Sequence, residues 1–384
     1  MERESITPRP DWEKRCEDIG FSYHSMDGVY WDERYYYRFS AGEIDELEAA
    51  TSELHQLCLK AVDNIVSNKR FDELKIPAAY HDYVTRSWQT REPSVFGRFD
   101  FAYDGKGPPK MLEYNADTPT ALLEGSVAQW EWLEQAILPQ QPHADQFNSI
   151  HEKLIDRWRV LHDSALKAKF LYFTCVKDND EDLGNIEYLR DTAQQGGFPT
   201  GLVYIDDIGW TGDQRMFVDQ AGQKIEALVK LYPWEWMVRE EFGLDLNESA
   251  MAIIEPPWKM LLSNKGLLRI LWELNPGHPN LLPAAFDRWR LAGQGSGDYV
   301  QKPIYSREGA NVTIYRGSEV IREEGTYGEE GFVYQAYTPI PQYGDSYTTI
   351  GSWIVGEEPA GIGIREDESP ITKNTSRFVP HYFV

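Results

Sequence analysis

The stretch Arg98-Phe-Asp-Phe-Ala-Tyr-Asp-Gly-Lys-Gly-Pro-Pro-Lys-Met-Leu-Glu-Tyr-Asn-Ala-Asp117 predicts a β-hairpin around which the rest of the chain is organised. Side chains of alternating character run from Val95 to Tyr103, and this is the period of a strand. The turn at 104–109 holds two glycines and two prolines, which suit a reversal of the chain. A second strand is therefore expected over 110–116.

The polar residues of this hairpin match the chemistry of a magnesium and phosphate site. Arg98 and Asp100 share one face of the first strand, and Glu113 and Asn115 share one face of the second. Carboxylate and amide oxygens suit Mg²⁺, and a guanidinium forms forked hydrogen bonds with phosphoryl oxygens. Thr118, followed by a proline, predicts the N-cap of a helix, whose N-terminus favours an anion. A solvated hairpin with cross-strand ion pairs fits the same pattern, so both interpretations stay open at this point.

Length and composition predict a globular cytoplasmic protein. The chain has 384 residues, enough for two or three lobes, and no apolar run reaches the roughly 20 residues that span a bilayer. The N-terminus lacks the apolar region of a signal peptide, and three cysteines are too few for a disulfide framework. A net charge of −24 argues against nucleic-acid binding and favours a cationic small molecule, although it also serves solubility. We expect neither a nucleic-acid nor a membrane partner.

The first two thirds of the chain predict helices around an α/β unit. A capping box from Ser40 to Glu43 begins a long amphipathic helix, in which His55 is expected at the surface or at the boundary of the core. Further helices are expected over 121–136, 144–169 and 223–231. An apolar run at 170–176, a helical pattern to about Gln195 and a strand at 202–205 predict parallel strands.

The last third predicts a helix near Ser263 and a β-rich lobe. Lys265 is expected in the first turn of that helix, where a ligand phosphate would explain a cation. Lys302 ends a strand, and a loop of small residues at 304–311 returns into another strand, as in a flap over phosphates. Further strands are expected over 332–337, 347–355 and 360–364.

In combination, these motifs resemble the synthetase domain of glutathionylspermidine synthase and trypanothione synthetase. The motifs are Arg-x-Asp, Glu-Tyr-Asn-Ala-Asp, Ser-Asn-Lys, Lys-Pro-Ile with a Gly-Asn loop, Tyr-Gln and a late strand arginine. The likeness extends over essentially the whole chain and is greatest to the stand-alone acid–amine ligases of that family. It implies an α+β fold, namely a circularly permuted ATP-grasp with an α/β pre-ATP-grasp lobe. We accordingly divide the chain into an N-terminal part of the catalytic core (1–150), the α/β lobe (151–245) and the ATP-grasp lobe (246–384).

The resemblance also implies roles for individual residues. Its Mg²⁺ ligands match Asp100, Glu113 and Asn115. Its arginines at the transferring phosphoryl group match Arg98 and Arg365. The positions that match ATP contacts, in addition to Arg98 and Asp100, are Phe99, Lys265, Lys302, Glu308, Gly309, Gln335, Ala336, Tyr337 and Thr338. Thr118 stands where the family has a serine on the glutathione side, and Glu181 with Asp182 matches an acidic pair implicated in polyamine binding.

The function implied is an ATP- and Mg²⁺-dependent acid–amine ligase that forms an amide through an acyl phosphate. The acid would be a small molecule or peptide resembling glutathione, and the amine a polyamine or a peptide. Glu181 or Asp182 would hold the cationic amine and take its proton. The chain offers no room for the amidase domain of the bifunctional members, so hydrolysis of the product is not expected. The alternatives are an ATPase or phosphotransferase with the same nucleotide site, and a catalytically idle protein that binds a peptide or polyamine.

Overall fold

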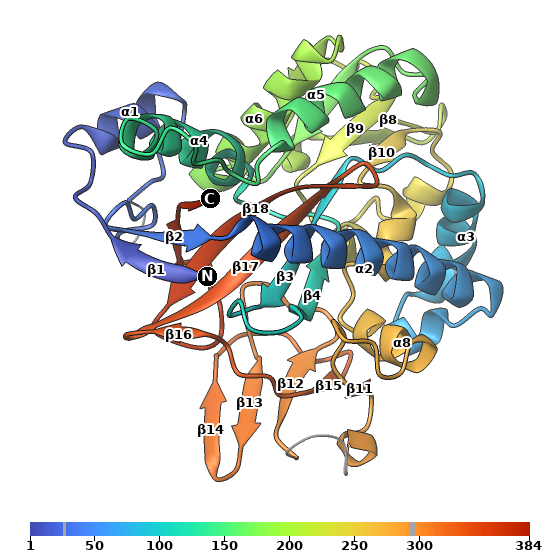
Figure 1. The fold of residues 1–384 in the computed structure, drawn as a ribbon. Coiled ribbons are helices and arrows are strands. Elements are labelled where there is room, and N and C mark those ends of the chain that lie inside the picture. Colours follow the sequence, from blue (N-terminus) through green and yellow to red (C-terminus); the bar gives the residue numbers. More distant parts are fainter. Residues whose placement is uncertain (26–27, 292–296) are drawn as a thin grey trace.

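A six-stranded antiparallel sheet lies at the centre of the computed structural model, which describes residues 1–25, 28–291 and 297–384 (Figure 1). Its main path runs in the order β19-β18-β17-β3-β4, and β16 pairs with β17. The strands are β3 (Phe96–Ala102), β4 (Lys110–Asn115), β16 (Gln342–Tyr343), β17 (Ser346–Val355), β18 (Glu358–Asp367) and β19 (Arg377–Val379). The predicted hairpin is confirmed as β3 and β4, and it joins strands from the far end of the sequence.

The register of this sheet places the polar residues of the hairpin in rows. Arg98 lies opposite Asn115, and Asp100 lies opposite Glu113. On the other side of β3, Asp100 pairs with Gly351 of β17, while Thr349 pairs with Arg365 of β18. Because side chains alternate along a strand, all these residues except the unsubstituted glycine present side chains to the same face.

The opposite face of the sheet is covered by the long helix α2 (Ala41–Ser67), which crosses it in Figure 1. The predicted capping box at Ser40 and Glu43 is present. Thr51 of α2 and Ser352 of β17 are joined by a buried hydroxyl–hydroxyl hydrogen bond of 2.7 Å. His55 is buried against the sheet, so its expected position at the surface or boundary is wrong; the apolar stripe of this helix is wider than its spacing indicated.

A parallel four-stranded sheet, β10-β9-β5-β6, forms the α/β unit. Its strands are β5 (Leu171–Thr174), β6 (Thr200–Leu202), β9 (Ala227–Lys230) and β10 (Ala252–Ile254), and its helices include α5 (Ile150–Val160) and α6 (Asp180–Gln195). The predicted strand–helix–strand unit is confirmed. The helix expected over 223–231 is wrong: residues 227–230 are all buried in the sheet, and a four-residue apolar run carries no reliable period.

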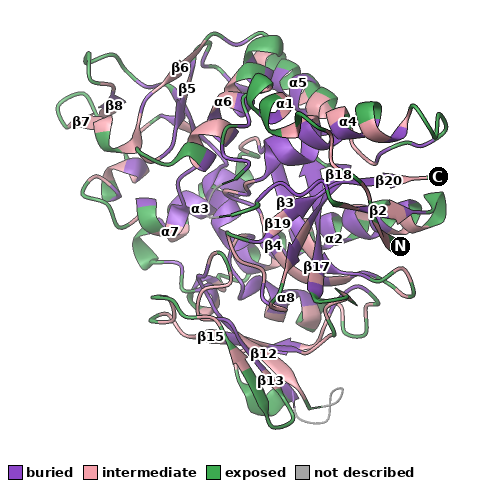
Figure 2. Ribbon diagram, turned by 90° about the vertical axis from the view of Figure 1, so that its left-hand side faces the viewer, coloured by how far each residue is buried: buried purple, intermediate pink, exposed green. Residues whose placement is uncertain are grey.

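A five-stranded antiparallel sheet, β11-β15-β12-β13-β14, forms the lobe at the bottom of Figure 1. Its strands are β11 (Ala284–Ala285), β12 (Tyr299–Pro303), β13 (Thr313–Arg316), β14 (Glu319–Arg322) and β15 (Phe332–Ala336). The predicted strand, loop and returning strand around 299–315 are confirmed. Figure 2 shows that the central sheet runs through the buried interior, whereas β14, at the edge of the lower lobe, is largely exposed.

The remaining elements support these three sheets. A three-stranded sheet joins β1 (Glu2–Ser5), β2 (Tyr35–Phe39) and β20 (His381–Phe383), and a two-stranded one joins β7 (Gly209–Thr211) and β8 (Met216–Val218). The other α-helices are α1 (Trp12–Asp18), α3 (His81–Gln89), α4 (Gln129–Trp132), α7 (Trp234–Met237) and α8 (Leu267–Leu274). Wider π-helical turns flank α4 at Glu124–Ala128 and Leu133–Ile137 and follow α5 at Leu161–Ala165. Among the described residues, no helix is long and apolar enough to cross a membrane.

Three predicted helix starts differ from the structure. Thr118 does not cap a helix, because residues 118–121 form an irregular turn in which Ala121 has a φ of 69°. The segment expected to be helical from 144 becomes helical only at Ile150, because residues 145 and 148 form β-bridges with residues 383 and 361. Helix α8 begins at Leu267, so Lys265 lies in the turn before it.

Helix α2 should lose stability when its N-cap is removed. The Ser40 side chain accepts a hydrogen bond from the Glu43 backbone N–H, and replacing such a cap costs about 1 kcal/mol. We expect Ser40→Ala to lower the free energy of unfolding in urea by about that amount. Ser67→Ala, at the exposed C-terminal end of the same helix, is the control. Equal stabilities for the two variants would show that the capping box contributes nothing.

Candidate active site

The polar face of the hairpin is a connected set of charged groups. The Arg98 guanidinium donates to both carboxylate oxygens of Asp100, at 2.7 and 3.2 Å, and to the carbonyl oxygen of Thr120 at 2.7 Å. The Asn115 amide nitrogen lies 3.1 Å from Asp100 Oδ2 and 3.2 Å from Glu113 Oε1. An N–H donor thus joins two carboxylates from neighbouring strands.

These three side chains fit a hard divalent cation. Among the residues described, no group of three or more His, Cys, Asp or Glu side chains could hold a metal, so a metal here depends on two carboxylates and an amide. Mg²⁺ is held in this manner in sites where substrate phosphates and water complete its coordination. Asp100, Glu113 and, after rotation of its amide group, the Asn115 oxygen would be its protein ligands.

Two lysines from distant segments meet at Glu113. Lys265 Nζ lies 3.1 Å from Glu113 Oε2 and donates to the Ser306 carbonyl, while Lys302 Nζ donates to the Leu112 carbonyl and to Gln335 Oε1. Burial opposes ionisation of Glu113, but the two ammonium groups outweigh it and hold the pKa of this carboxyl well below its ordinary value. Burial lowers the pKa of Lys302 to about 8. Two buried lysine side chains thus lie beside the candidate metal-ligating carboxylate of Glu113.

The two candidate catalytic arginines lie on the same face and are fixed by different supports. Arg98 fits because β17 has a glycine opposite: a Cβ on Gly351 would stand 2.7 Å from Arg98 Cδ. Arg365 donates to the carbonyl oxygens of Lys373, Asn374 and Ser376, each at 2.9 Å. Its guanidinium also lies over the Tyr30 ring, 5.3 Å from the centroid. Both cations are thus oriented before any ligand arrives.

A cavity between the central and the lower sheets ends at this charged face. Its polar end is formed by Asp100, Glu113 and Lys302, and its walls are mainly aliphatic. The lining also includes Leu112, Leu282, Val300, Gly309, Val312, Ile314, Gln335, Ala336, Tyr337, Thr338, Ile340, Thr349, Pro370, Ile371 and Thr372. The backbone N–H groups of Ala336 and Tyr337 donate to the carbonyls of residues 283 and 298. If an adenine ring binds beside this segment, other atoms of the segment must contact it.

Phe99, expected among the nucleotide-binding residues, has its side chain on the other face of the sheet. Its fully buried ring stacks on Tyr114, with 3.9 Å between the ring centroids. The alternation of side chains along β3 places Phe99 in the core for the same reason that it places Asp100 in the site. Its side chain therefore does not reach the cavity.

Two candidate residues of the loop between β12 and β13, Glu308 and Gly309, lie in different regions. Gly309 lines the cavity and has a φ of 71°; a Cβ there would lie 2.6 Å from Ile371 Cγ2. Glu308, in contrast, lies near the acidic residues of α6: burial and then Glu181 raise its pKa. We therefore assign Glu308 to the acidic side of the site.

The acidic pair predicted to bind the amine lies in the first turn of α6. Glu181 is buried, and the Asp182 backbone N–H donates to the Asn179 side chain that caps the helix. Burial, followed by the charges of Glu181 and Glu308, raises the pKa of Asp182 to about 7. Such a group gains from a cationic ligand, because an ammonium would relieve the repulsion among three carboxylates.

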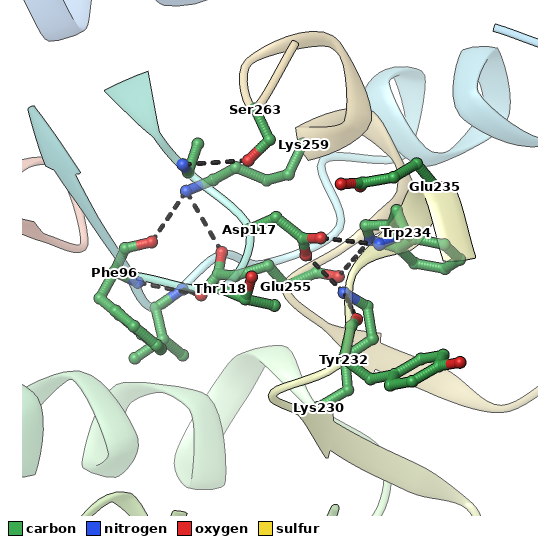
Figure 3. Close-up of polar contacts among 12 residues, drawn as sticks. Phe96, Asp117, Thr118, Lys230, Tyr232, Trp234, Glu235, Glu255, Lys259 and Ser263 are labelled. Carbon is green, nitrogen blue, oxygen red and sulfur yellow. Dashed lines mark hydrogen bonds and ion pairs between the residues drawn. The ribbon is translucent and has the colours of Figure 1, made fainter. Parts of the chain in front are cut away.

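A second network, which the sequence analysis did not predict, connects Thr118 with the α/β unit. Arg307 donates to the Thr118 hydroxyl at 2.5 Å and, through two nitrogens, to the Glu235 carboxylate at 2.9 and 3.2 Å. Asp117 accepts from the Trp234 backbone N–H and forms a fully buried ion pair with Lys230 (Figure 3). A lone lysine in the apolar run 227–231 was the available signal for this pair.

The start of β3 is held by another buried ion pair, also drawn in Figure 3. Glu255 accepts from the backbone N–H groups of Val95 and Phe96, and Lys259 donates to the Phe96 carbonyl. The two charged side chains are 3.3 Å apart and almost fully buried. Glu255 follows β10 and Lys230 ends β9, so both ends of the hairpin are fixed to neighbouring strands of the parallel sheet.

Comparison with known proteins identifies the family. Residues 3–384 match the family model described as glutathionylspermidine synthase preATP-grasp. This chain belongs to the glutathionylspermidine synthase family. The resemblance inferred from the motifs is confirmed, and the chain is an ATP-dependent carbon–nitrogen ligase by family.

Relatives within this family differ in length. A Haemophilus influenzae protein named "Putative acid--amine ligase" is 41% identical over 387 residues, which cover 98% of both chains. Trypanothione synthetase of Crithidia fasciculata and the bifunctional glutathionylspermidine synthetase/amidase of Escherichia coli are each 28% identical. The alignments cover 85% and 91% of this chain but only 53% and 59% of those proteins.

A solved structure supports the fold. The glutathione synthetase like-effector of Globodera pallida, in its apo form, matches with a TM-score of 0.57 at 11% identity and covers 98% of both chains. At this identity the likeness concerns the fold alone. It agrees with the mixed α and β architecture of this chain.

The buried Asp117–Lys230 pair should be essential for stability. Removing one member of a buried ion pair leaves an uncompensated charge and costs about 3–5 kcal/mol. We expect Lys230→Met to lower the free energy of unfolding by about that amount, and Asp117→Asn to restore part of it in the double variant. Lys224→Met, which removes a surface ion pair, should cost at most about 1 kcal/mol. Equal losses for the two lysine variants in urea unfolding would contradict the assignment.

Proposed function

We propose that this chain joins a carboxylic acid to an amine at the expense of ATP, through an acyl phosphate. The observation that carries the proposal is the charge arrangement on one face of the central sheet. Asp100, Glu113 and Lys302 form the polar end of an aliphatic cavity, and an amide, a second lysine and two arginines lie on the same face of the sheet or contact these groups. A separate group of carboxylates lies on α6 and its neighbouring loop.

The cavity suits ATP in one orientation. The aliphatic walls and the segment 335–338 would hold the adenine ring, and the phosphates would point to Lys265, Lys302 and the metal ligands. Mg²⁺ bound by Asp100, Glu113 and Asn115 would neutralise charge on the phosphates. Gly309 would close the loop over them, since backbone without a side chain approaches phosphate most closely.

The residues then support two chemical steps. In the first, an oxygen of the acid attacks the γ-phosphorus and ADP leaves, while Arg98 and Arg365 stabilise charge spread over the transferring phosphoryl group. In the second, a neutral amine attacks the acyl carbon and phosphate leaves. The carboxylates Glu181, Asp182 and Glu308 would hold the amine substrate, whose other nitrogens carry positive charge.

The substrate classes follow from the two ends of this arrangement. Arg307 and Thr118 would offer a guanidinium and a hydroxyl to an anionic acid. In the structure Arg307 binds the Glu235 carboxylate, and a substrate carboxylate would compete with Glu235 for this guanidinium. Glutathione and spermidine, taken from the names of relatives, are therefore the first acid and amine to test. The same topology supports a circular permutation: the hairpin from residues 96–115 completes a sheet of strands from 346–379. The three-part division at residues 150 and 245 is likewise a proposal.

The function is tested by nucleotide turnover. Purified protein and Mg-ATP would be incubated with pairs of one acid and one amine. The acids are glutathione, other small peptides and other small acids, and the amines are spermidine, other polyamines and amino acids. Product masses would be measured by mass spectrometry. We expect ADP release that requires both partners, and a product lighter by one water than their sum. ADP release indifferent to every amine would indicate an ATPase or phosphotransferase. No turnover with any pair would indicate a protein that only binds its ligands.

The metal site has its own test. We expect Asp100→Asn combined with Glu113→Gln to weaken Mg-ATP binding by more than about 100-fold, since losing even an indirect partner of a metal ligand costs about 10- to 100-fold. Without metal, the same changes remove negative charge and should leave ATP binding no weaker. Asp104→Asn, in the exposed turn of the hairpin, is the control. Unchanged Mg-ATP affinity in calorimetry would remove the metal site.

A further inference from the structure

The carboxyl of Glu124 is buried at the start of the helix after the hairpin and has no role in the proposed chemistry. Glu124 is fully buried, and its Oε1 accepts a 2.6 Å hydrogen bond from the Tyr30 hydroxyl. Its second oxygen, Oε2, makes no hydrogen bond of ordinary geometry in the described parts of the chain, and the Tyr23 hydroxyl is the neighbouring donor. A buried carboxyl oxygen that is incompletely hydrogen-bonded is costly and calls for an explanation, such as a catalytic role or a bound ligand.

Two tyrosines connect this carboxyl with the active site. The Tyr30 ring lies beneath the Arg365 guanidinium, 5.3 Å away. Tyr23 is almost fully buried, and its hydroxyl faces the Glu124 carboxyl. Its ring packs on α6 at Gly184, where a Cβ would stand 2.4 Å from Tyr23 Cε1. The pair of tyrosines therefore lies between Arg365 and the helix that carries the amine-site carboxylates.

A short hydrogen-bonded bridge fixes Glu124 near Glu181. The Asn185 side chain accepts from the Leu122 backbone N–H at 3.1 Å and donates to the Glu181 carbonyl at 2.9 Å. The first turn of α6 and the helical turn that begins at Glu124 are thus adjacent. Tyr23, Tyr30 and Glu124 lie close enough to Glu181 for its charge to raise the pKa of each of them.

The charges around Glu124 suit a proton acceptor at neutral pH. The titratable and charged groups that face it are Tyr23, Tyr30, Glu181 and Arg365. Burial raises the pKa of Glu124 to about 7; Glu181 adds to this, while Tyr30 and Arg365 oppose it. A carboxyl with a raised pKa is protonated below that value and ionised above it, so its capacity to accept a proton appears as pH rises through about 7.

We propose that Glu124, acting through the hydroxyl of Tyr30, takes the proton that the amine substrate must lose before it attacks the acyl phosphate. This rests on the proposed ligase function. The ammonium passes a proton to the Tyr30 oxygen as the Tyr30 proton moves to Glu124 Oε1, leaving a neutral amine and a neutral carboxyl. The amine nitrogen then forms the bond to the acyl carbon, the bond from that carbon to the phosphate oxygen breaks, and the second proton leaves with phosphate. Glu181 and Asp182 keep the task of holding the substrate, and Glu124 is a positioning and proton-accepting residue behind Tyr30.

Amines of different basicity distinguish this role from a structural one. Spermidine is an ammonium ion at pH 7 and needs a base, whereas hydroxylamine is largely neutral there and traps an acyl phosphate as a hydroxamate without one. The full chain would be assayed with Mg-ATP, glutathione and each amine. The pH would run from roughly 6 to 9, a range that includes the raised pKa of the Glu124 carboxyl. The variants are Glu124→Gln and Tyr30→Phe, and Glu134→Gln, an exposed carboxyl on the same helical segment, is the control.

We expect wild-type kcat with spermidine to rise with pH through about 7. Glu124→Gln should lower it by about 100-fold or more and remove that rise, while hydroxamate formation stays within about a factor of three of wild type. Tyr30→Phe should behave in the same way. Equal losses with both amines, or a spermidine rate and pH profile unchanged in Glu124→Gln, would overturn the proposal.

A measurement on the ligand-free protein separates this proposal from the ligase function. If wild type releases no ADP and forms no hydroxamate, the ligase proposal has failed rather than the assignment of Glu124. Infrared difference spectra between pH 6 and pH 8 (roughly one unit either side of neutrality) should still show a carboxyl that is ionised in wild type and missing in Glu124→Gln. Absence of that carboxyl signal in wild type would overturn the titration on which the proton transfer depends.

Discussion

Both ends of the central hairpin are held by buried ion pairs at the carboxyl ends of two neighbouring parallel strands. Lys230, at the end of β9, pairs with Asp117 just after β4, and Glu255, just after β10, pairs with Lys259 and binds the backbone where β3 begins (Figure 3). Buried charges are costly unless they are paired, so these two ion pairs narrowly define the relative position of the two sheets. The position of the polar face of the hairpin, with its candidate metal ligands, is set by these contacts.

Positively and negatively charged side chains lie on different sides of this hairpin. The side toward the cavity holds lysines around Glu113, and the side toward α6 holds carboxylates. Burial and then repulsion from Glu181 raise the pKa values of Asp182 and Glu308 on that side. Arg365, lying on Tyr30, stands between the two sides. A phosphorylated acid suits the first and an ammonium the second, and the bond between them would form at the boundary. The overall charge of −24 says nothing of this local separation.

The sequence predicted those parts whose causes are local. Alternation and a Gly-Pro turn predicted β3 and β4, and a capping box predicted the start of α2. Glu113 and Asn115 could be placed on one face for the same reason. Lys265 was singled out by its place at the start of a predicted helix, and Arg365 by the family resemblance, but that they lie near the hairpin arises from tertiary contacts. Strand β9 was mistaken for a helix, and Lys230, Arg307 and Glu124 were overlooked, because each takes its meaning from a partner more than 60 residues away.

The central claim is that phosphate is transferred to the acid before the amine attacks, and isotope transfer tests it most directly. The acid substrate would carry ¹⁸O in its reacting carboxylate, and the inorganic phosphate formed during amide synthesis would be analysed by mass spectrometry. Reaction through an acyl phosphate places one ¹⁸O atom in each phosphate released, because the bond from the acyl carbon to oxygen breaks when the amine attacks. Phosphate free of label, or label found in AMP, would contradict an acyl phosphate and with it the assigned roles of the two arginines.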